Sequence, residues 1–568
     1  MRKPGTPNLA TTATSVGSEG EGERGRGREY LSGTGGTAPH VKRRNGMLKL
    51  PLSFGSLGSL GRLGRFGDHD VQRRFGLHLA AKIVGALIAV IAVKAIGTYF
   101  FTPAFAEDAA PEPAPFINPL NTMWTLVAAF LVFFMQAGFM ALEAGFSRTR
   151  ETVNILLEGI VDTCLCGILF YAFGFAFMFG SGNGFIGLQY FFLQNAPETY
   201  GSTGVPLLAF WLFQFAFADT CSTITSGAMV GRTSFVGDLL YSVGVSGFIY
   251  PIIGHWAWGP DGWLNTIKPA AFHDFAGSTV VHTIGGFVAL AGAMALGPRL
   301  GRKFKRDGGG PPPGHDMVMA AVGGVILWFG WYGFNPGSTL SAMDFQGISR
   351  VATNTTLAAC AGGLTSLAFI YPRNKVWDCG ITVNGFLAGL VAITCPCYWV
   401  SPIGAISIGA IAGVFVILAI DFIEWLRIDD PVGAVAVHGF CGIWGTLSLG
   451  LFACGKYGAA GPTGADNSPA AVVTGLFYGG GTAQLIGQAV GSIAVTAATF
   501  GVSLAMMFAL KKMGVLRVSE EGEREGLDVH EHGGSAYPEL LSGVGYSAPE
   551  AAPSAKTMAS VVSAASAE

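Results

Sequence analysis

The sequence is short of charge. Asp, Glu, Lys and Arg make up only 12% of its 568 residues, whereas a soluble domain usually carries about 25%. The formal net charge of -2 excludes a generally basic chain of the kind that binds nucleic acid. The nine cysteines lack the paired spacing of metal ligands, and they indicate no disulfide framework. In place of charge the chain has 50% hydrophobic residues and 84 glycines, which is typical of a membrane protein.

Both ends of the chain are polar and of low complexity. Residues 1–76 are rich in Gly, Arg and Ser and cannot bury a core, so we expect a disordered leader or a start at Met47 or later. Residues 77–106 follow the basic flank of Arg73 and Arg74 and combine a short apolar stretch with an Ala-x-Ala-like site, which predicts a signal peptide cleaved after Ala106. An uncleaved anchor helix is the alternative. Residues 539–568 are expected to form a disordered tail.

Long apolar runs fill residues 107–511, and these predict an all-α integral membrane domain. A transmembrane helix needs about 20 mostly apolar residues. Eleven runs qualify, at roughly 121–145, 155–180, 205–230, 235–258, 275–297, 316–336, 349–371, 376–397, 402–426, 431–453 and 480–510. Arg and Lys gather in the loops after the odd-numbered runs. The positive-inside rule therefore predicts a multi-pass protein of the cell (inner) membrane, with the mature N-terminus outside and the C-terminus in the cytoplasm.

One motif occurs twice. DFAGSTVVH, which ends at His282, and DPVGAVAVH, which ends at His438, both read D-x-x-G-x-x-x-V-H. Each opens the fifth helix of a set of five, which predicts a five-plus-five inverted repeat followed by an eleventh helix. Eight α-helical residues rise about 12 Å, so both histidines are expected near the midplane. An ionisable side chain is costly at that depth, and a matched pair indicates function.

The aspartates that open the two motifs, Asp274 and Asp430, have a simpler interpretation. A carboxylate at a helix start accepts hydrogen bonds from free backbone N–H groups and suits the helix dipole. Asp430, which is followed by a proline in the first turn, is expected to act mostly as such a cap. Asp274 lies deeper in apolar sequence, so we expect it also to shape the electric field at the outer mouth.

A second pattern lies at the outer end of the sixth helix. Ser338 follows Phe334 by four residues, which predicts a hydroxyl one turn above an aromatic ring on one helix face. A hydroxyl acceptor and an aromatic face together suit a small cation, through hydrogen bonding and cation–π attraction. The pattern needs no carboxylate, and this disfavours a hard metal ion.

Several long motifs then occur in a characteristic order. They are QAGFMALEAG (136–145), DFAGSTVVH, GWYGFNPGS (330–338), DDPVGAVAVHGFCGIWG (429–445) and GLDVHEHGGSAYP (526–538). Together they resemble the Amt/Mep/Rh family of ammonium transporters, in its bacterial Amt type, over about residues 120–537. The resemblance implies eleven transmembrane helices in a five-plus-five inverted repeat and a homotrimer with one pore per subunit. It implies no enzyme activity, no cofactor and no metal site.

The resemblance also implies roles for individual residues at the outer end of the pore. Trp258, Phe217 and Ser338 would form an external ammonium site. Phe217 and Phe334 would form a stacked gate. Asp274 would support the outer site.

Below the gate, the resemblance implies that His282 and His438 are a pore histidine pair that shares a hydrogen bond. Phe213 and Gln214 would lie one turn from the gate on the third helix, and Trp331 would lie near the upper pore.

The expected function is ammonium transport. NH4+ would bind outside, lose its proton near the gate and pass the histidine pair as NH3, a route closed to potassium because it cannot shed its charge. Burial disfavours imidazolium, so one histidine must donate and the other accept.

Residues 512–538 are expected to form a cytoplasmic regulatory tail that couples subunits, with a trimeric PII-type signalling protein as a plausible partner. One departure from the family pattern is Asp219, which stands two residues after the gate where a small or apolar residue is expected.

Two other functions stay open from the sequence. An ammonium sensor, or transceptor, would keep the same pore and signal through the tail, which is too short to hold a kinase or cyclase domain. A membrane oxidoreductase would hold haem between the two histidines, but it needs room for the macrocycle and usually more than one pair. A Soret band in the absorption spectrum would identify the oxidoreductase.

Overall fold

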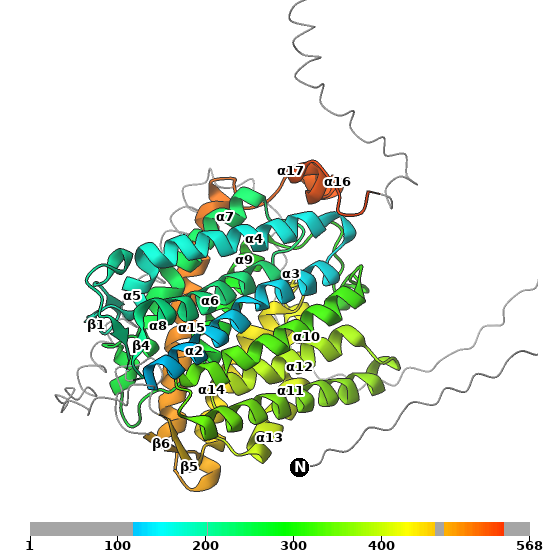
Figure 1. The fold of residues 1–568 in the computed structure, drawn as a ribbon. Helices are drawn as coiled ribbons and strands as arrows, with labels where there is room; N and C mark the ends of the chain where they lie inside the picture. The colour runs from blue at the N-terminus through cyan, green and yellow to red at the C-terminus, as the bar shows by residue number, and fades with distance from the viewer. Residues whose placement is uncertain (1–116, 202, 460–470, 539–568) are drawn as a thin grey trace, which may run out of the picture. The chain divides into compact units, whose positions relative to one another are not determined.

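The structure is a computed structural model, and it describes residues 117–201, 203–459 and 471–538. The leader, the signal peptide and the terminal tail expected from the sequence lie outside these residues, so those expectations stay predictions. Within the described ranges the fold is built almost entirely from helices, as Figure 1 shows.

The regular elements follow the apolar runs. The α-helices are α2 (Ile117–Phe133), α3 (Met135–Phe146), α4 (Thr152–Leu169), α5 (Phe175–Phe179), α6 (Leu207–Gly227), α7 (Phe235–Gly244), α8 (Tyr250–Trp258), α9 (Ile284–Leu296), α10 (Met317–Phe334), α11 (Phe345–Asn374), α12 (Cys379–Thr394), α13 (Pro402–Trp425), α14 (Cys441–Phe452), α15 (Ala483–Lys512), α16 (Glu520–Glu525) and α17 (Leu527–His532). Four π-helical segments interrupt or open them: η2 (Phe170–Gly174), η4 (Val245–Ile249), η6 (Ser278–Thr283) and η9 (Val435–Phe440).

The remaining elements are short and lie in the connections. Single 3-10 turns form η1 (Thr149–Glu151), η3 (Phe191–Leu193), η5 (Trp263–Thr266), η7 (Lys305–Asp307), η8 (Pro336–Thr339) and η10 (Leu476–Tyr478). Three antiparallel two-stranded pairs are β1 (Gly182–Asn183) with β2 (Ile186–Gly187), β3 (Thr199–Tyr200) with β4 (Val205–Pro206), and β5 (Cys454–Ala459) with β6 (Ala471–Thr474).

Ten helical segments of the described residues are long and apolar enough to cross a membrane. They are Ile117–Phe146, Thr149–Phe179, Leu207–Gly227, Phe235–Thr266, Ser278–Leu296, Met317–Thr339, Phe345–Asn374, Pro402–Trp425, Val435–Phe452 and Ala483–Lys512. Each coincides with one predicted run. The run predicted at 376–397 coincides with α12, an apolar helix of only 16 residues. The prediction of an all-helical membrane protein is confirmed, whereas the count of eleven spans stays a prediction.

Neighbouring helices approach each other closely through small residues. In Figure 1, α3 runs beside α10, and α11 runs beside α12. A Cβ atom added to Gly323 of α10 would lie 2.4 Å from the main-chain nitrogen of Leu142 on α3, so only glycine fits at this contact. Apolar side chains gain little by leaving lipid for another helix, so close main-chain packing of this kind supplies much of the association between membrane helices.

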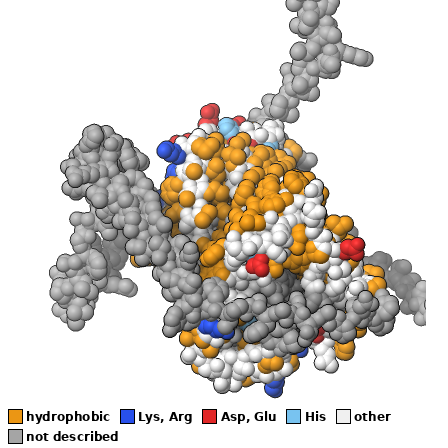
Figure 2. Space-filling view, turned by 90° about the vertical axis from the view of Figure 1, so that its left-hand side faces the viewer, with side chains coloured by type: hydrophobic (Ala, Val, Ile, Leu, Met, Phe, Trp, Pro, Cys, Tyr) orange, Lys and Arg blue, Asp and Glu red, His pale blue; other side chains and the backbone are white. Residues whose placement is uncertain are grey.

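The outer surface of the bundle is apolar. On α10 the exposed side chains Val318, Val322, Val325 and Phe329 recur at steps of three or four residues, which is one face of a helix. Figure 2 shows one face of the molecule, on which apolar side chains gather and charged ones are few. A continuous apolar surface of this kind suits contact with lipid.

The segment after α15 packs back onto one end of the bundle. The main-chain N–H of Asn154, near the start of α4, donates to Asp528 Oδ1 at 3.0 Å, and His532 Nε2 lies 2.8 Å from the side-chain oxygen of Asn154. Arg517 pairs with Thr233 in an isolated antiparallel bridge. Burial raises the pKa of Asp528. The described tail is therefore ordered against the helices that it follows.

Candidate functional site

Two histidines meet inside the bundle. His282 lies in η6 and His438 in η9, and their exposed fractions are 0% and 6%. Their Nδ1 atoms are 3.2 Å apart and their ring centroids 5.2 Å apart. A hydrogen bond between two Nδ1 atoms needs one N–H donor and one lone pair, so at least one of the rings must be neutral. The structure thus brings together the two histidines that the repeated motif singled out.

An aspartate caps each of the two histidine-bearing segments. Asp274 accepts main-chain N–H bonds from residues 277–280 at 2.8–3.0 Å, and Asp430 accepts three from residues 433–435 at 2.9–3.1 Å. Burial raises the pKa of both carboxyls to about 6, although the N–H bonds oppose this rise. Both are therefore largely ionised at neutral pH, and both suit the positive end of the helix dipole.

The rise of 12 Å expected from eight α-helical residues is wrong in detail. Helical structure after Asp274 begins only at Ser278 and is π-helical through His282. Gly277, which joins the cap to the helix, has φ = +113°, a conformation that residues with a side chain rarely adopt. The sequence motif therefore encodes a capped turn followed by a short π-helix.

Glycines set the distance between the two histidine-bearing helices. A Cβ atom added to Gly286 would lie 2.2 Å from the main-chain nitrogen of Gly439 and 2.5 Å from its Cα. Gly286 follows His282 by four residues, and Gly439 follows His438 directly. Main-chain contact at this crossing fixes how closely the imidazoles approach.

Two stacked phenylalanine rings lie above the histidine pair. Phe217 of α6 and Phe334 of α10 have centroids 4.0 Å apart and an interplanar angle of 22°. Both are buried, and the Phe334 ring lies 5.4 Å from the His282 ring. Trp331, expected near the upper pore, stacks on His282 at 5.2 Å and donates its Nε1–H to Thr394 Oγ1 at 2.9 Å. The rings form a continuous column from the gate to the histidines.

The outer residues also come together beside the gate. Trp258 meets Phe217 edge to face at 6.1 Å, and its Nε1–H donates to the main-chain oxygen of Asp274 at 2.8 Å. The carbonyl of Asp274, and not its carboxylate, therefore holds this tryptophan. Ser338 lies one turn after Phe334 as expected, in the 3-10 turn η8 that continues α10 in one helical segment. The Ser338 hydroxyl donates to the Phe334 carbonyl at 2.7 Å, which leaves its own lone pairs free to accept.

Phe213 and Gln214 precede the gate on α6. Phe213 packs against Phe217 with centroids 4.7 Å apart. Gln214 is buried, and its Oε1 has no hydrogen-bond partner within the described residues. The structure brings Phe213 into the aromatic column, and it shows no contact of Gln214 with the outer group.

Two cavities continue the space below the histidines. The first is about 20 Å³ and is lined by His438 and Glu143, among others, which leaves room for one water-sized molecule. The second is about 350 Å³ and shares Asn384, Val432 and Gly433 with the first. The two cavities therefore lie next to each other, and His438 lines the smaller one.

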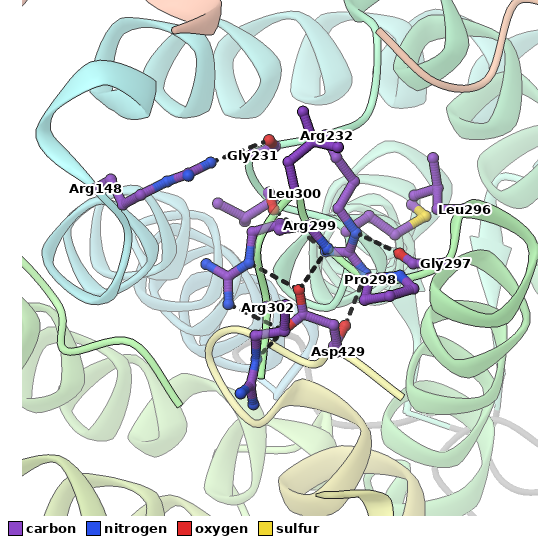
Figure 3. A network of polar contacts seen from close by, with 12 residues as sticks. Arg148, Gly231, Arg232, Leu296, Gly297, Pro298, Arg299, Leu300, Arg302 and Asp429 are labelled. Carbon is purple, nitrogen blue, oxygen red and sulfur yellow. Dashed lines mark hydrogen bonds and ion pairs between the residues drawn. The ribbon is translucent and has the colours of Figure 1, made fainter. Parts of the chain in front are cut away.

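Figure 3 shows three arginines around Asp429, next to the cap of η9. Arg299 donates to the Asp429 carboxylate from Nε at 2.8 Å and from Nη2 at 3.0 Å, Arg302 from Nε at 3.1 Å, and Arg232 donates to the main-chain oxygen at 2.7 Å. Burial opposes ionisation, but Arg299 and Arg232 hold the pKa of Asp429 well below its usual range. Burial lowers the pKa of Arg232 to about 10, so it remains charged at neutral pH. We call these four residues the arginine cluster.

Sequence reasoning missed the arginine cluster and four buried acids, Glu143, Glu158, Asp162 and Asp238. The signal for the acids was present, since each lies inside or at the start of an apolar run. An intramembrane carboxyl is costly, and for this reason alone it should be examined as a functional candidate. A fifth buried acid, Asp219, was singled out from the sequence.

The fold and the site define a multi-pass membrane protein with a column of aromatic rings and two histidines buried among its helices. The model of the Ammonium Transporter Family matches residues 123–537. The chain belongs to this family, which confirms the resemblance drawn from its motifs.

Individual relatives support the assignment to this family. Ammonium transporter Amt2 of Archaeoglobus fulgidus is 44% identical over 469 residues, which cover 81% of this chain and 95% of the relative. A putative ammonium transporter of Synechocystis is 39% identical, over 80% of this chain and 96% of its own. Among solved structures, one titled Sensor Amt Protein matches with a TM-score of 0.65 at 38% identity, covering 73% of this chain and 98% of that one. Mep2 of Candida albicans matches with a TM-score of 0.63 at 28% identity, covering 71% and 87%.

Proposed function

We propose that the protein moves ammonium across the membrane as NH3. NH4+ binds at the outer group of Trp258, Phe217 and Ser338, and it gives up a proton near the Phe217–Phe334 gate. NH3 then passes the histidine pair. The observation that carries this proposal is the hydrogen-bonded pair itself, which lies beneath two stacked rings and above a cavity with room for one water-sized molecule.

Deprotonation is the step that separates ammonium from potassium. A site that only attracts small cations binds both ions, because the two are similar in size and charge. The column between the gate and the histidines is buried and aromatic, so an ion that keeps its charge there loses several kcal/mol of hydration. NH3 has no charge to desolvate, and it can accept or donate hydrogen bonds at the imidazoles. The column therefore favours the neutral species.

Electrical recording tests the proposal directly. Purified protein in liposomes, adsorbed on a solid-supported membrane, is expected to give a current when ammonium is added and none when potassium is added at the same concentration. A potassium current as large as the ammonium current would contradict the proposal.

The Trp258→Leu variant is expected to weaken ammonium binding at the outer group. Loss of a cation–π contact worth about 0.5–2 kcal/mol corresponds to an apparent affinity lower by roughly 2- to 30-fold. The concentration dependence of the ammonium-evoked current measures this change. Trp256→Leu is the matched control, because this half-buried tryptophan bonds to the Phe185 carbonyl and lies away from the gate. Equal loss in both variants would contradict the assignment of Trp258.

We propose the finer architecture on the same grounds. Eleven transmembrane helices, with α12 as the eighth, arranged as a five-plus-five inverted repeat plus one, account for the two capped motifs with equal spacing. The loop charges support an N-terminus outside and a C-terminus in the cytoplasm of the cell membrane. A homotrimer and a PII-type partner at the tail follow from the family resemblance. Cross-linking of detergent-solubilised protein, with a trimer band expected, tests the first of these assemblies.

A sensing role is the second candidate. It is favoured by the likeness to the solved protein titled Sensor Amt Protein and by the packing of the tail on α4. A sensor is expected to bind ammonium at the outer group with no steady current. Binding measured by calorimetry together with silent electrical recordings would favour sensing over transport.

A further inference from the structure

A third cavity lies in the connection between α9 and α10, and it is lined by positive charge. Its volume is about 230 Å³. Four of its nine described lining residues are cationic, namely Arg148, Arg299, Arg302 and Lys303, and none of the nine is acidic. We call this space the basic cavity. It shares no described lining residue with the small cavity at His438, so the proposed path of NH3 does not account for it.

The three arginines of the basic cavity already have carboxylate partners. Arg148 pairs with Glu151, which is fully buried. Arg299 and Arg302 share the Asp429 carboxylate, as Figure 3 shows. These ion pairs hold the guanidinium groups in fixed positions around the cavity.

The cations nevertheless outnumber the carboxylates. The third carboxylate is Glu424, the second partner of Arg302. Lys303 is exposed and forms no ion pair within the described residues. Arg232 lies behind the cavity, where it donates only to main-chain oxygens of the described residues. Five cations therefore stand against three carboxylates, which leaves an excess of two positive charges.

The tail does not cancel this excess. Glu523 of α16 accepts a hydrogen bond from the main-chain N–H of Leu300, a residue that lines the basic cavity. The Glu523 carboxylate is itself paired with Arg517 at 2.6 Å. The tail therefore adds one charge of each sign beside the cavity, and the positive excess remains.

Several N–H groups of the lining remain available to a ligand. The Nε atom of Arg148 is buried and has no hydrogen-bond partner within the described residues. Arg299 uses Nε and Nη2 for Asp429, and its Nη1 forms no hydrogen bond in the described part of the chain. The ammonium group of Lys303 adds three further donors. A buried donor without a partner costs free energy, and an anion in the cavity would remove that cost.

Charge, donors and volume together suit a phosphate group. A phosphate monoester carries a charge of about -1.5 to -2 at neutral pH and three strong acceptor oxygens, which matches the excess of two positive charges. Guanidinium groups bind such oxygens with good geometry. Drug-sized ligands usually occupy about 300–1,000 Å³, so the smaller basic cavity favours a small phosphorylated molecule over a nucleotide. A single carboxylate would neutralise only half of the excess.

The basic cavity also borders the larger cavity of about 350 Å³. Pro312 lines both spaces, and Glu424, the partner of Arg302, lines the larger one. Asp429 directly precedes Asp430, the cap of η9. A ligand that orders the basic cavity therefore also restrains a wall of the larger cavity.

We propose that the basic cavity binds the phosphate group of a small molecule dissolved in the water at this end of the bundle. Lys303 Nζ, Arg148 Nε and Arg299 Nη1 donate to the phosphate oxygens. Arg302 holds the wall through its bonds to Asp429 and Glu424. The exposed residues Gly301, Lys303 and Gly309 leave the cavity open to water, so a soluble ligand can enter. The site does not depend on how ammonium moves through the pore.

Titration of the full-length, detergent-solubilised protein tests the proposal. The probes are sodium phosphate and glycerol 3-phosphate, each added at constant ionic strength because screening weakens charge interactions. Calorimetry is expected to show saturable binding, and the melting temperature is expected to rise with ligand concentration. Lys303→Gln removes one charged donor from an exposed position, so the affinity is expected to fall at least about tenfold. Arg299 and Arg302 stay in place, since their loss would also unpair Asp429.

The matched control is Lys305→Gln. Lys305 lies two residues further along the same loop, does not line the basic cavity and pairs with Asp421 at 2.7 Å. Both variants remove one positive charge from the loop, so a difference between them reports the position of the ammonium group. The affinity of Lys305→Gln for both probes is expected to match the wild type.

Hydrogen exchange locates the ligand. Phosphate is expected to slow exchange of the main-chain amides of residues 299–310 in the wild type and not in Lys303→Gln. No saturable binding of either probe, or an equal loss of affinity in the two lysine variants, would overturn the proposal. Protection by phosphatidylglycerol vesicles with none by the soluble probes would assign the site to a lipid headgroup and overturn a soluble ligand. These measurements use no ammonium, so their failure would leave the proposed transport function untouched.

Discussion

Ammonium transport is expected to fall by at least about 100-fold in the double variant His282→Ala, His438→Ala. The two rings share one hydrogen bond inside a buried aromatic column, and their nitrogens are polar groups that the column offers to NH3. Without them the molecule must cross an apolar gap, or water enters and carries ions with it. The measurement is uptake of methylammonium together with the currents evoked by ammonium and by potassium.

The control for this variant is His530→Ala, which removes an exposed imidazole from the tail helix α17. Its transport is expected to match the wild type. Methylammonium uptake at the wild-type rate in the double variant would sink the assigned role of the pair. A potassium current that appears only in the double variant would instead support a role in selectivity.

Loss of stability by about 3–5 kcal/mol is the expected result of Asp429→Ala. The change leaves Arg299, which is only 6% exposed, without its carboxylate partner, whereas Arg302 keeps its second partner Glu424. A buried charge without a partner is strongly destabilising. The free energy of unfolding is therefore expected to fall by more than an exposed ion pair contributes. Thermal or denaturant unfolding of the detergent-solubilised protein measures the difference.

Acid should weaken the same cluster. The pKa of Asp429 is held well below its usual range, so its contribution is fully present above the unfolded pKa of about 3.9. That contribution is lost as the pH falls through the lower, folded pKa, and Asp429→Ala should be less sensitive to pH in this window. The matched control is Asp421→Ala, whose partners Lys305 and Arg373 are about half exposed. A cost of only about 0–1 kcal/mol is expected there. Equal costs for the two variants would contradict the role of burial.

The sequence predicted the helices and the histidine pair well, for a physical reason. A membrane helix has to be apolar along its whole length, so the ten long spans, and the shorter α12 as well, stand out as apolar runs in the sequence. His282 and His438 were recognisable because an ionisable side chain is rare in such runs and because the same motif placed both.

Geometry that depends on several helices at once could not be predicted. The π-helical form of η6 depends on the cap at Asp274, and the 3-10 form of η8 follows the end of α10 at Phe334. The arginine cluster joins residues almost 200 positions apart, as in the bond from Arg232 to Asp429. Nothing in a single apolar run shows that Asp162 and Asp219 lie on facing helices.

The crossing at Gly286 and Gly439 determines how the pore responds to its surroundings. Because main chain meets main chain there, the separation of the imidazoles is fixed by the stiffest part of the two helices and not by side-chain packing. Bilayer thickness and lipid composition act first on the lipid-facing helices at the periphery. We therefore expect lipid to alter the rate of ammonium entry at the outer mouth while the discrimination made at the histidines stays constant from one membrane to another.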